Sequence, residues 1–287
     1  MIRFVRLGVF AVIILASAHR GLALEFRSEP SSSLDLAIKG GLAGVPKGAT
    51  RYLRWSDLAT LPKSKIRITG EFVPGEQEVT VVFLSDLMKA LPLAPGVDTA
   101  VATCTDGFVT LFKTSFIEHY HPFIVLEIAG KPSSAWPPPG ITYNPGPYAI
   151  TVSARLAPDA GSFLDIEHKK PWGVNALEFV TYSDAFKDYY SEAYAAVSDR
   201  AKAGREIWMN SCLCCHSGPV SSFAGTKSGR PYAVVAAYAL SAPAYFKRYV
   251  RNPQGEVTCA QMDAHPHYTD EELNALIAFI AREPAKS

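Results

Sequence analysis

The sequence is poor in charge and has no excess of either sign. Charged residues make up 19% of the 287 positions, and 28 Lys and Arg stand against 27 Asp and Glu, which gives a formal net charge of +1. Nucleic-acid binding calls for a basic excess or a basic stripe, so the balance argues against that class. Hydrophobic residues reach 48%, which is typical of a soluble globular chain.

Long apolar runs are also missing. The longest stretch, from Leu7 to Ala18, follows Arg3 and Arg6 and ends in small residues. A bilayer crossing needs about twenty apolar residues, so this run is too short for a membrane span. A basic start, a short apolar run and an A-x-A ending predict a Sec-type signal peptide over 1–23 and a periplasmic protein without a membrane span. The alternative is an uncleaved anchor.

One short motif points directly to a cofactor. Cys212, Cys215 and His216 form a C-x-x-C-H run, the attachment signal of a c-type haem. The two thiols add to the two vinyl groups of one porphyrin, and the histidine falls beneath the iron. A structural zinc knuckle or a redox dithiol would use the same pair of cysteines.

The residues around the motif have helical periodicity. Gly204, Trp208 and Cys212 recur every four residues, which places them on one helix face. A second helix is predicted from about Pro243, and Thr269 and Glu272 form a capping box that opens a third. The sequence therefore predicts an all-α unit around the motif.

This unit, over 198–287, resembles a class I bacterial cytochrome c. The segment from Gln261 to Tyr268 is similar to the family's distal-ligand loop. The resemblance implies one covalent haem c, with His216 as the proximal and Met262 as the distal iron ligand. Met209, His265 and His267 are the alternatives. Because both axial positions would be filled, the resemblance implies transfer of single electrons and no chemistry at the iron.

The preceding stretch, 51–186, changes to strand periodicity. Apolar and polar residues alternate or cluster in short runs, and an Asp-Gly pair at Asp106 predicts a hairpin. An α+β, mostly β, domain is expected, preceded by an extension over 24–50 and followed by a linker over 187–197. The predicted strands cover 65–69, 79–83, 99–104, 108–112, 123–128, 148–152 and 176–180, with a short helix over 84–88.

Short motifs occur in a fixed order along this domain. They are Arg54–Leu58, Leu84–Leu87, Cys104–Phe108, Gly146–Tyr148, Trp172–Val174 and Glu178–Val180. Their order resembles the molybdopterin-binding fold of the sulfite oxidase family in a short form. The resemblance implies a molybdopterin cofactor, with Cys104 as the thiolate ligand of molybdenum.

The composition argues against that cofactor. A pterin phosphate needs cationic side chains or helix N-termini, but cations are few after Asp106, and the residues after Cys104 depart from the family's Cys-Ala-Gly pattern. A plain buried cysteine is the simpler interpretation of Cys104. The domain is then a docking module without a cofactor.

Several other residues have two interpretations. His119 and His121 have the H-x-H spacing of a metal pair but are expected at the surface, as are the residues from His168 to Lys170. The basic residues Lys247, Arg248 and Arg251 form either a steering patch for an acidic partner or a solvated helix face. Cysteines left after haem attachment predict one disulfide and one free thiol among Cys104, Cys214 and Cys259.

The sequence as a whole predicts an exported monohaem cytochrome c fused behind a mostly β domain. Its partners are expected to be a periplasmic redox protein or a respiratory complex. The alternative is an enzyme, a molybdenum oxidoreductase similar to a sulfite dehydrogenase. In that case Cys104 holds the molybdenum, and the electrons pass one at a time from the metal to the fused haem.

Overall fold

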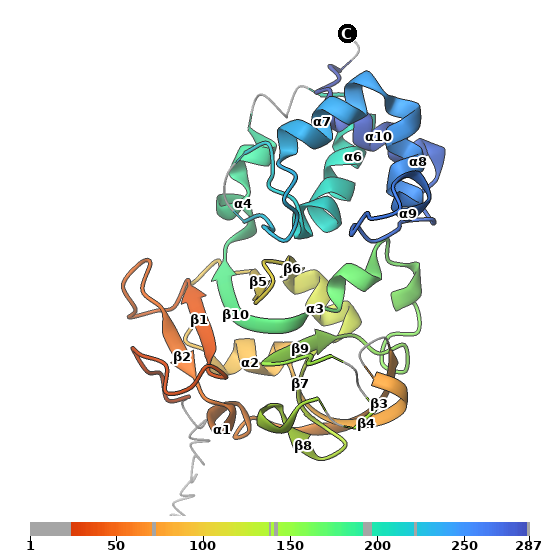
Figure 1. Ribbon diagram of the computed structural model, residues 1–287. Helices are drawn as coiled ribbons and strands as arrows, with labels where there is room; N and C mark the ends of the chain where they lie inside the picture. Colours follow the sequence, from red (N-terminus) through yellow and green to blue (C-terminus); the bar gives the residue numbers. More distant parts are fainter. Residues whose placement is uncertain are drawn as a thin grey trace, which may run out of the picture.

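The chain folds into a β-rich part followed by a helical part (Figure 1). The computed structural model describes residues 24–70, 73–137, 139–140, 143–191, 197–220 and 223–285. The predicted signal peptide lies outside the described residues, and so does 192–196 of the predicted linker. In the described part of the chain, no helix has the length and apolar character that a bilayer crossing requires.

The β-rich part is built on one mixed sheet. Its path runs β2 (Arg51–Leu53), β1 (Leu36–Gly40), β10 (Trp172–Val180), β9 (Tyr148–Thr151), β7 (Phe123–Ile128), β4 (Val73–Phe83) and β3 (Ser64–Gly70). Off this path, β5 (Thr99–Cys104) pairs with β10 and β6 (Val109–Lys113), and β8 (Lys131–Pro132) pairs with β7. The β1–β10 pair is parallel, and the other described pairs are antiparallel.

Short helices connect and cover the strands. They are α1 (Trp55–Leu58), α2 (Leu84–Ala90), α3 (Thr114–Tyr120) and α4 (Tyr182–Ala185), with single turns η1 (Ser133–Ala135), η2 (Ala160–Ser162), η3 (Ile166–Lys169) and η4 (Lys187–Tyr190). Each predicted strand and the predicted helix after β4 are present. The segment expected to be an extension, 24–50, is instead part of the fold, because it supplies β1 between β2 and β10.

The helical part follows residue 197. It contains α6 (Asp199–Asn210), the single turn η5 (Cys212–Cys214), α7 (Tyr232–Ser241), α8 (Pro243–Arg251), α9 (Pro253–Glu256) and α10 (Asp270–Ile280). The capping box is confirmed: Glu272 N donates to Thr269 Oγ1 at 3.2 Å, and Thr269 N donates to Glu272 Oε2 at 2.7 Å. The sequence did not predict α7.

A close crossing of α6 and α10 organises this part. A Cβ atom on Gly204 would lie 1.9 Å from the carbonyl oxygen of Ala275, so only glycine permits the approach. One turn further along, Trp208 packs against Phe279, with ring centroids 6.2 Å apart. Because the predicted face carries both Gly204 and Trp208, the helix that leads into the C-x-x-C-H run is held against the end of the chain.

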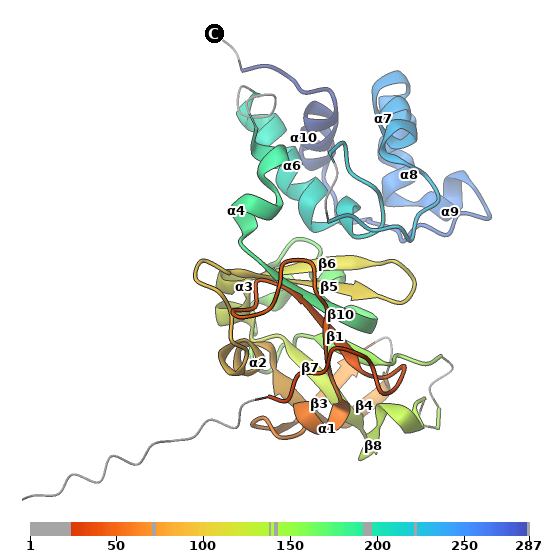
Figure 2. The same ribbon diagram turned by 90° about the vertical axis from the view of Figure 1, so that its left-hand side faces the viewer.

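The β5–β6 hairpin lies between the two parts (Figure 2). Side chains alternate across a strand, and here both faces are buried. Ala100, Ala102 and Phe112 face the apolar cluster of the β-rich part. Val101 and Leu111 face the cluster that contains Trp208 and Phe279 of the helical part. The hairpin therefore contributes to both cores.

Candidate functional site

The C-x-x-C-H residues follow α6 in one tight turn. The backbone N–H of His216 donates to the carbonyl oxygen of Cys212 at 2.8 Å, and the N–H of Cys215 donates to the same oxygen at 3.2 Å. Cys212 and Cys215 are half-buried free thiols. Cys214 is buried, and its Sγ contacts the carbonyl oxygen of Asn210 at 3.4 Å. The two motif cysteines are thus partly accessible, whereas the third cysteine of the turn, Cys214, is buried.

The imidazole of His216 is held at one nitrogen. Its Nδ1 lies 3.1 Å from the carbonyl oxygen of Arg230, which can only accept a hydrogen bond, so Nδ1 carries the proton. This leaves the Nε2 lone pair for a ligand. Burial lowers the pKa of His216, which favours the neutral ring. A neutral histidine with one nitrogen anchored to a carbonyl has the arrangement found in metal-binding histidines.

The candidate sulfur ligands differ in their surroundings. Met262 is half-buried against the apolar cluster of the helical part, and Cys212 packs against the same cluster. Met209 is 1% exposed and belongs to the core of that cluster. Met209 is therefore a space-filling residue, as expected for a methionine on an apolar helix.

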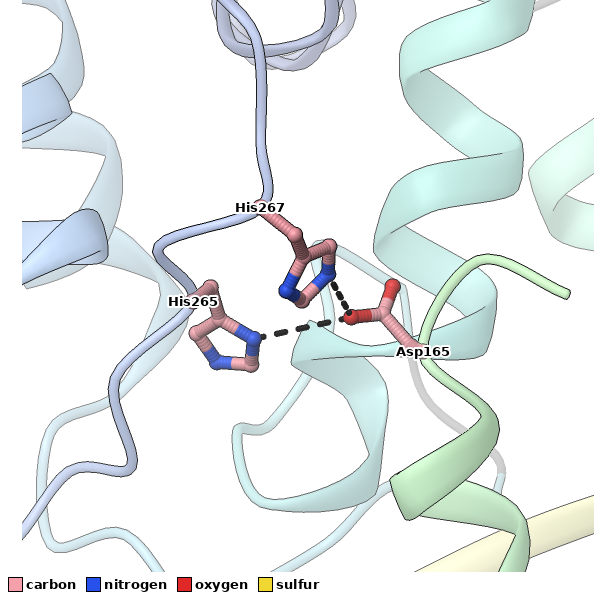
Figure 3. A group of neighbouring side chains, drawn as sticks. All are labelled: Asp165, His265 and His267. Atoms are coloured by element: carbon pink, nitrogen blue, oxygen red, sulfur yellow. Dashed lines mark hydrogen bonds and ion pairs between the residues drawn. The ribbon is translucent and has the colours of Figure 1, made fainter. Parts of the chain in front are cut away.

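His265, another predicted alternative, belongs to a different group of side chains. Its Nδ1 lies 3.6 Å from Oδ1 of Asp165, and Nε2 of His267 lies 2.9 Å from the same oxygen. Figure 3 shows both histidines on the loop before α10, turned toward a carboxylate from the β-rich part. Sequence reasoning missed this group because Asp165 and His267 are 102 residues apart.

The Asp165 carboxylate is fully buried at the junction of the two parts. Its Oδ2 accepts hydrogen bonds from the hydroxyls of Ser211 and Tyr268. Burial alone raises the pKa of Asp165, but the hydrogen bonds from His265, Ser211 and Tyr268 outweigh it, and the net pKa is well below the usual range. The carboxylate is therefore ionised and fixed.

A cavity of about 870 Å³ opens beside this group, and both parts of the chain line it. Phe108 and Trp172 come from the β-rich part, and Lys227, Asp263 and His265 come from the helical part. Lys227 and Asp263 also act on the pKa of Cys215, which burial raises to about 11. The cavity therefore lies at the junction of the two parts of the chain.

The prediction that His168 to Lys170 form a solvated loop is wrong for the first two residues. The ring of His168 stacks on His265 with centroids 5.2 Å apart, and burial lowers the pKa of His168 to about 4. Lys169 is 1% exposed, and its Nζ donates to the carbonyl oxygen of Leu111 at 2.8 Å. A polar run in sequence does not reveal that the turn η3 is enclosed.

The H-x-H pair is at the surface, as predicted. His119 and His121 are both exposed, and Nε2 of His119 pairs with Oδ2 of Asp159 at 2.6 Å. The chain reverses at His121, which has φ 49° at the end of α3, so the two residues do not lie on a strand as the spacing argument assumed.

Cys104 ends β5 and is 3% exposed in the apolar cluster of the β-rich part. Burial, and next the charge of Asp106, raise the pKa of its thiol far above the usual range. It lines neither the 870 Å³ cavity nor a second cavity of about 470 Å³ beside Lys169. The predicted disulfide is absent: Cys104, Cys214 and Cys259 are all free.

The basic residues of α8 are matched by acidic residues of the same chain. Arg248 Nε lies 2.9 Å from Glu256 Oε1, and Arg251 lies 2.7 Å from Asp270 Oδ1. Lys247 is 3.9 Å from the same Asp270 atom. This pairing favours a solvated helix face over a steering patch.

Comparisons with known proteins give little support for either predicted resemblance. No protein-family model matches the chain, and no curated protein matches it. Among solved structures, the sulfane dehydrogenase SoxCD from Paracoccus pantotrophus is similar, with 13% sequence identity and a TM-score of 0.37. The match covers 54% of this chain and 40% of that chain, so the chain corresponds to less than half of SoxCD.

Lys169 gives the first testable prediction. Its pKa is lowered by burial from 10.5 to about 8, so between these pH values the unfolded chain binds more protons than the folded one. Stability from this group therefore rises as the pH increases from 8 to 10.5. Relative to Lys169→Met, the free energy of unfolding of the wild type should rise by up to about 3 kcal/mol over that pH range, because each unit of pKa shift corresponds to about 1.36 kcal/mol.

Urea unfolding at several pH values measures this difference. Lys170→Met is the matched control, because its side chain is more exposed and pairs with Glu167 at the surface. A constant difference in unfolding free energy between wild type and Lys169→Met would contradict the prediction.

Proposed function

We propose that the helical part carries one covalently bound haem c and passes single electrons between redox partners outside the cytoplasm. The observation that carries the proposal is that the C-x-x-C-H residues have free thiols and a histidine with one anchored nitrogen. Two free thiols flank a turn, and the following histidine has Nδ1 held by Arg230 and Nε2 left as a ligand. Export rests on the predicted signal peptide over 1–23.

The residues present fit a haem in three respects. The thiols of Cys212 and Cys215 are unbonded and half-buried, whereas Cys214 is turned toward Asn210. His216 is neutral in the tautomer that iron requires. The buried Nε1 of Trp208 has no hydrogen-bond partner among the described residues, and such an orphaned donor indicates an acceptor that these residues do not supply.

A haem held in this way would supply a one-electron couple. In the proposal, His216 and Met262 would hold the iron, and Cys212 and Cys215 would hold the porphyrin. The thioether of Met262 is a soft ligand that favours the reduced metal, so it raises the reduction potential. Tight packing between α6 and α10 keeps water from the interior around Trp208.

The β-rich part is proposed as a docking module that is fixed to the electron-transfer part. Lys227 and Asp106 form an ion pair of 2.9 Å across the junction, and Thr226 N donates to the carbonyl oxygen of Gly107 at 2.8 Å. The apolar contacts of the β5–β6 hairpin lie behind them. Because the junction is fixed, a redox partner docked on the β-rich part would be held at a constant distance from the proposed haem.

The attachment residues give a direct prediction. Replacing both Cys212 and Cys215 by alanine should abolish covalent haem, because no thioether then forms. Haem staining after denaturing electrophoresis measures this. Cys214→Ala is the matched control and should retain the stain, since this thiol points away from the turn. Retention of haem by the double variant would refute the assignment.

Met262 gives a separate prediction. Met262→Ala should remove the sulfur-to-iron absorption band of the oxidised protein and lower its reduction potential, because a harder or absent ligand stabilises the reduced iron less. The matched control is Met209→Leu, which alters a core methionine and should keep the band. If Met262→Ala keeps the band, another residue is the distal ligand.

A molybdenum oxidoreductase is the second candidate, and one observation favours it. The hairpin turn after Cys104 contacts the loop after the C-x-x-C-H residues, where Thr226 N donates to the carbonyl oxygen of Gly107 at 2.8 Å, so a metal at Cys104 would lie on the side of the β-rich part that faces those residues. The surroundings of Cys104 fit the cofactor poorly. The thiol is enclosed among apolar side chains, and Lys227 is the cation whose charge acts on it.

Metal analysis separates the two candidates. Haem-loaded protein, made in a host that produces the molybdenum cofactor, should contain no molybdenum above background. Cys104→Ser should then keep its haem and its redox behaviour. One equivalent of molybdenum that is lost in Cys104→Ser but kept in Cys259→Ser would establish the oxidoreductase instead.

A further inference from the structure

The group around Asp165 has a feature that neither electron transfer nor docking uses. Three imidazoles meet one carboxylate oxygen. Oδ1 of Asp165 lies 2.9 Å from Nε2 of His267, 3.6 Å from Nδ1 of His265 and 3.8 Å from Nδ1 of His168. The carboxylate is fully buried, while His267 reaches the surface with 46% of its side chain exposed.

The carboxylate is oriented by the opposite oxygen. Ser211 and Tyr268 both donate to Oδ2, which saturates that side and leaves Oδ1 for the histidines. The backbone of Asp165 adds to this constraint, because its φ is 62° in the left-handed region. Such a conformation persists where the surroundings fix it, as at ligand sites. The hydroxyls thus act as outer partners that hold a ligand in place.

The distances suit a small cation. One ligand atom from each of Asp165, His265 and His267 lies within 4.8 Å of the other two. Ligands about 2.0 to 2.2 Å from a tetrahedral zinc ion are roughly 3.3 Å apart. The two separations from Oδ1, 2.9 and 3.6 Å, bracket that value. The third separation, between the two imidazole ligand atoms, is at most 4.8 Å, so the two rings would have to close toward each other by no more than about 1.5 Å.

We propose that Asp165, His265 and His267 bind a divalent transition-metal ion of the zinc class. Two imidazoles and one carboxylate form a three-ligand set that leaves one position of a tetrahedral ion for water or another ligand. The same residues line the 870 Å³ cavity, so the fourth position faces a space of small-molecule size. Each imidazole would present a nitrogen lone pair to the ion, so a proton now on that nitrogen moves to the other ring nitrogen.

His168 supplies a second observation that points to a ligand. Its Nδ1 is buried and, in the part of the chain that the structure describes, lies 3.8 Å from Oδ1 of Asp165 without forming a hydrogen bond, although its ring stacks on His265. A buried polar atom without a partner calls for an explanation. An ion at Oδ1 would provide one, since an additional ligand or a metal-bound water would lie next to this nitrogen.

The site would also join the two parts of the chain. Asp165 precedes η3 in the β-rich part, and both histidines lie on the loop before α10, three and five residues after Met262 (Figure 3). A metal would therefore fix the loop that carries the proposed distal ligand. The site shares no residue with the haem, so the two proposals stand or fall separately.

Zinc binding to haem-loaded protein tests the proposal. The haem occupies Cys212 and Cys215, and a Cys259→Ser background removes the exposed thiol. After equilibrium dialysis against Zn²⁺, elemental analysis should find one zinc per haem. His267→Ala should weaken zinc at least tenfold, a loss seen even for outer partners of metal sites, with an unchanged haem spectrum as evidence of folding.

His119→Ala is the matched control. His119 also pairs with a single carboxylate, that of Asp159, but among the described residues it does not belong to the three-residue group at Asp165, so this variant should bind zinc as tightly as the parent. Asp165→Asn should lose zinc as His267→Ala does. Absence of bound zinc, or equal binding by the His267→Ala and His119→Ala variants, would show that the group is only a hydrogen-bonded cluster and would overturn the proposal.

Discussion

The structure depends on the burial of the β5–β6 hairpin from both sides. One face packs in the core of the β-rich part, and the other packs against the cluster around Trp208. Each buried Val or Leu side chain contributes about 1.5 to 3 kcal/mol, so Val101 and Leu111 anchor the helical part as effectively as residues of its own. Neither part has a complete core without this hairpin.

The apolar contacts of the hairpin offset the free-energy cost of burying the Asp165 carboxylate. Placing an ionised carboxylate in a protein interior carries a penalty of several kcal/mol unless its hydrogen bonds are satisfied. Asp165 meets this condition, because Ser211, Tyr268 and His267 form hydrogen bonds with its carboxylate. All three residues come from the helical part of the chain. The carboxylate therefore depends on the junction that the hairpin holds, and it in turn fixes the loop that follows Met262.

Local sequence signals predicted most of the elements but not their assembly. The Asp-Gly turn and the capping box at Thr269 each act within a few residues, where backbone chemistry decides the outcome. Strand β1 pairs in parallel with β10, so its partner is far away along the chain. The same holds for Asp165 and His267. His168 and Lys169 were assigned to the surface because polar residues usually lie there, and burial of such residues depends on distant partners that periodicity does not reveal.

The junction also explains why the two parts belong to one chain. The turn of the hairpin reaches the loop that follows the attachment residues, where the carbonyl oxygen of Gly107 accepts from Thr226. Gly107 has φ +84°, and a Cβ there would lie 2.4 Å from Oγ1 of Thr226, so glycine is required for the contact. The loop then returns to the motif, since Ser228 N donates to the carbonyl oxygen of Cys215 at 2.9 Å. The β-rich part thus supports the backbone on which Cys215 is held. A free-standing helical unit would lack that support, and Cys212 and Cys215 would be less well fixed for the two thioether bonds of the proposed haem.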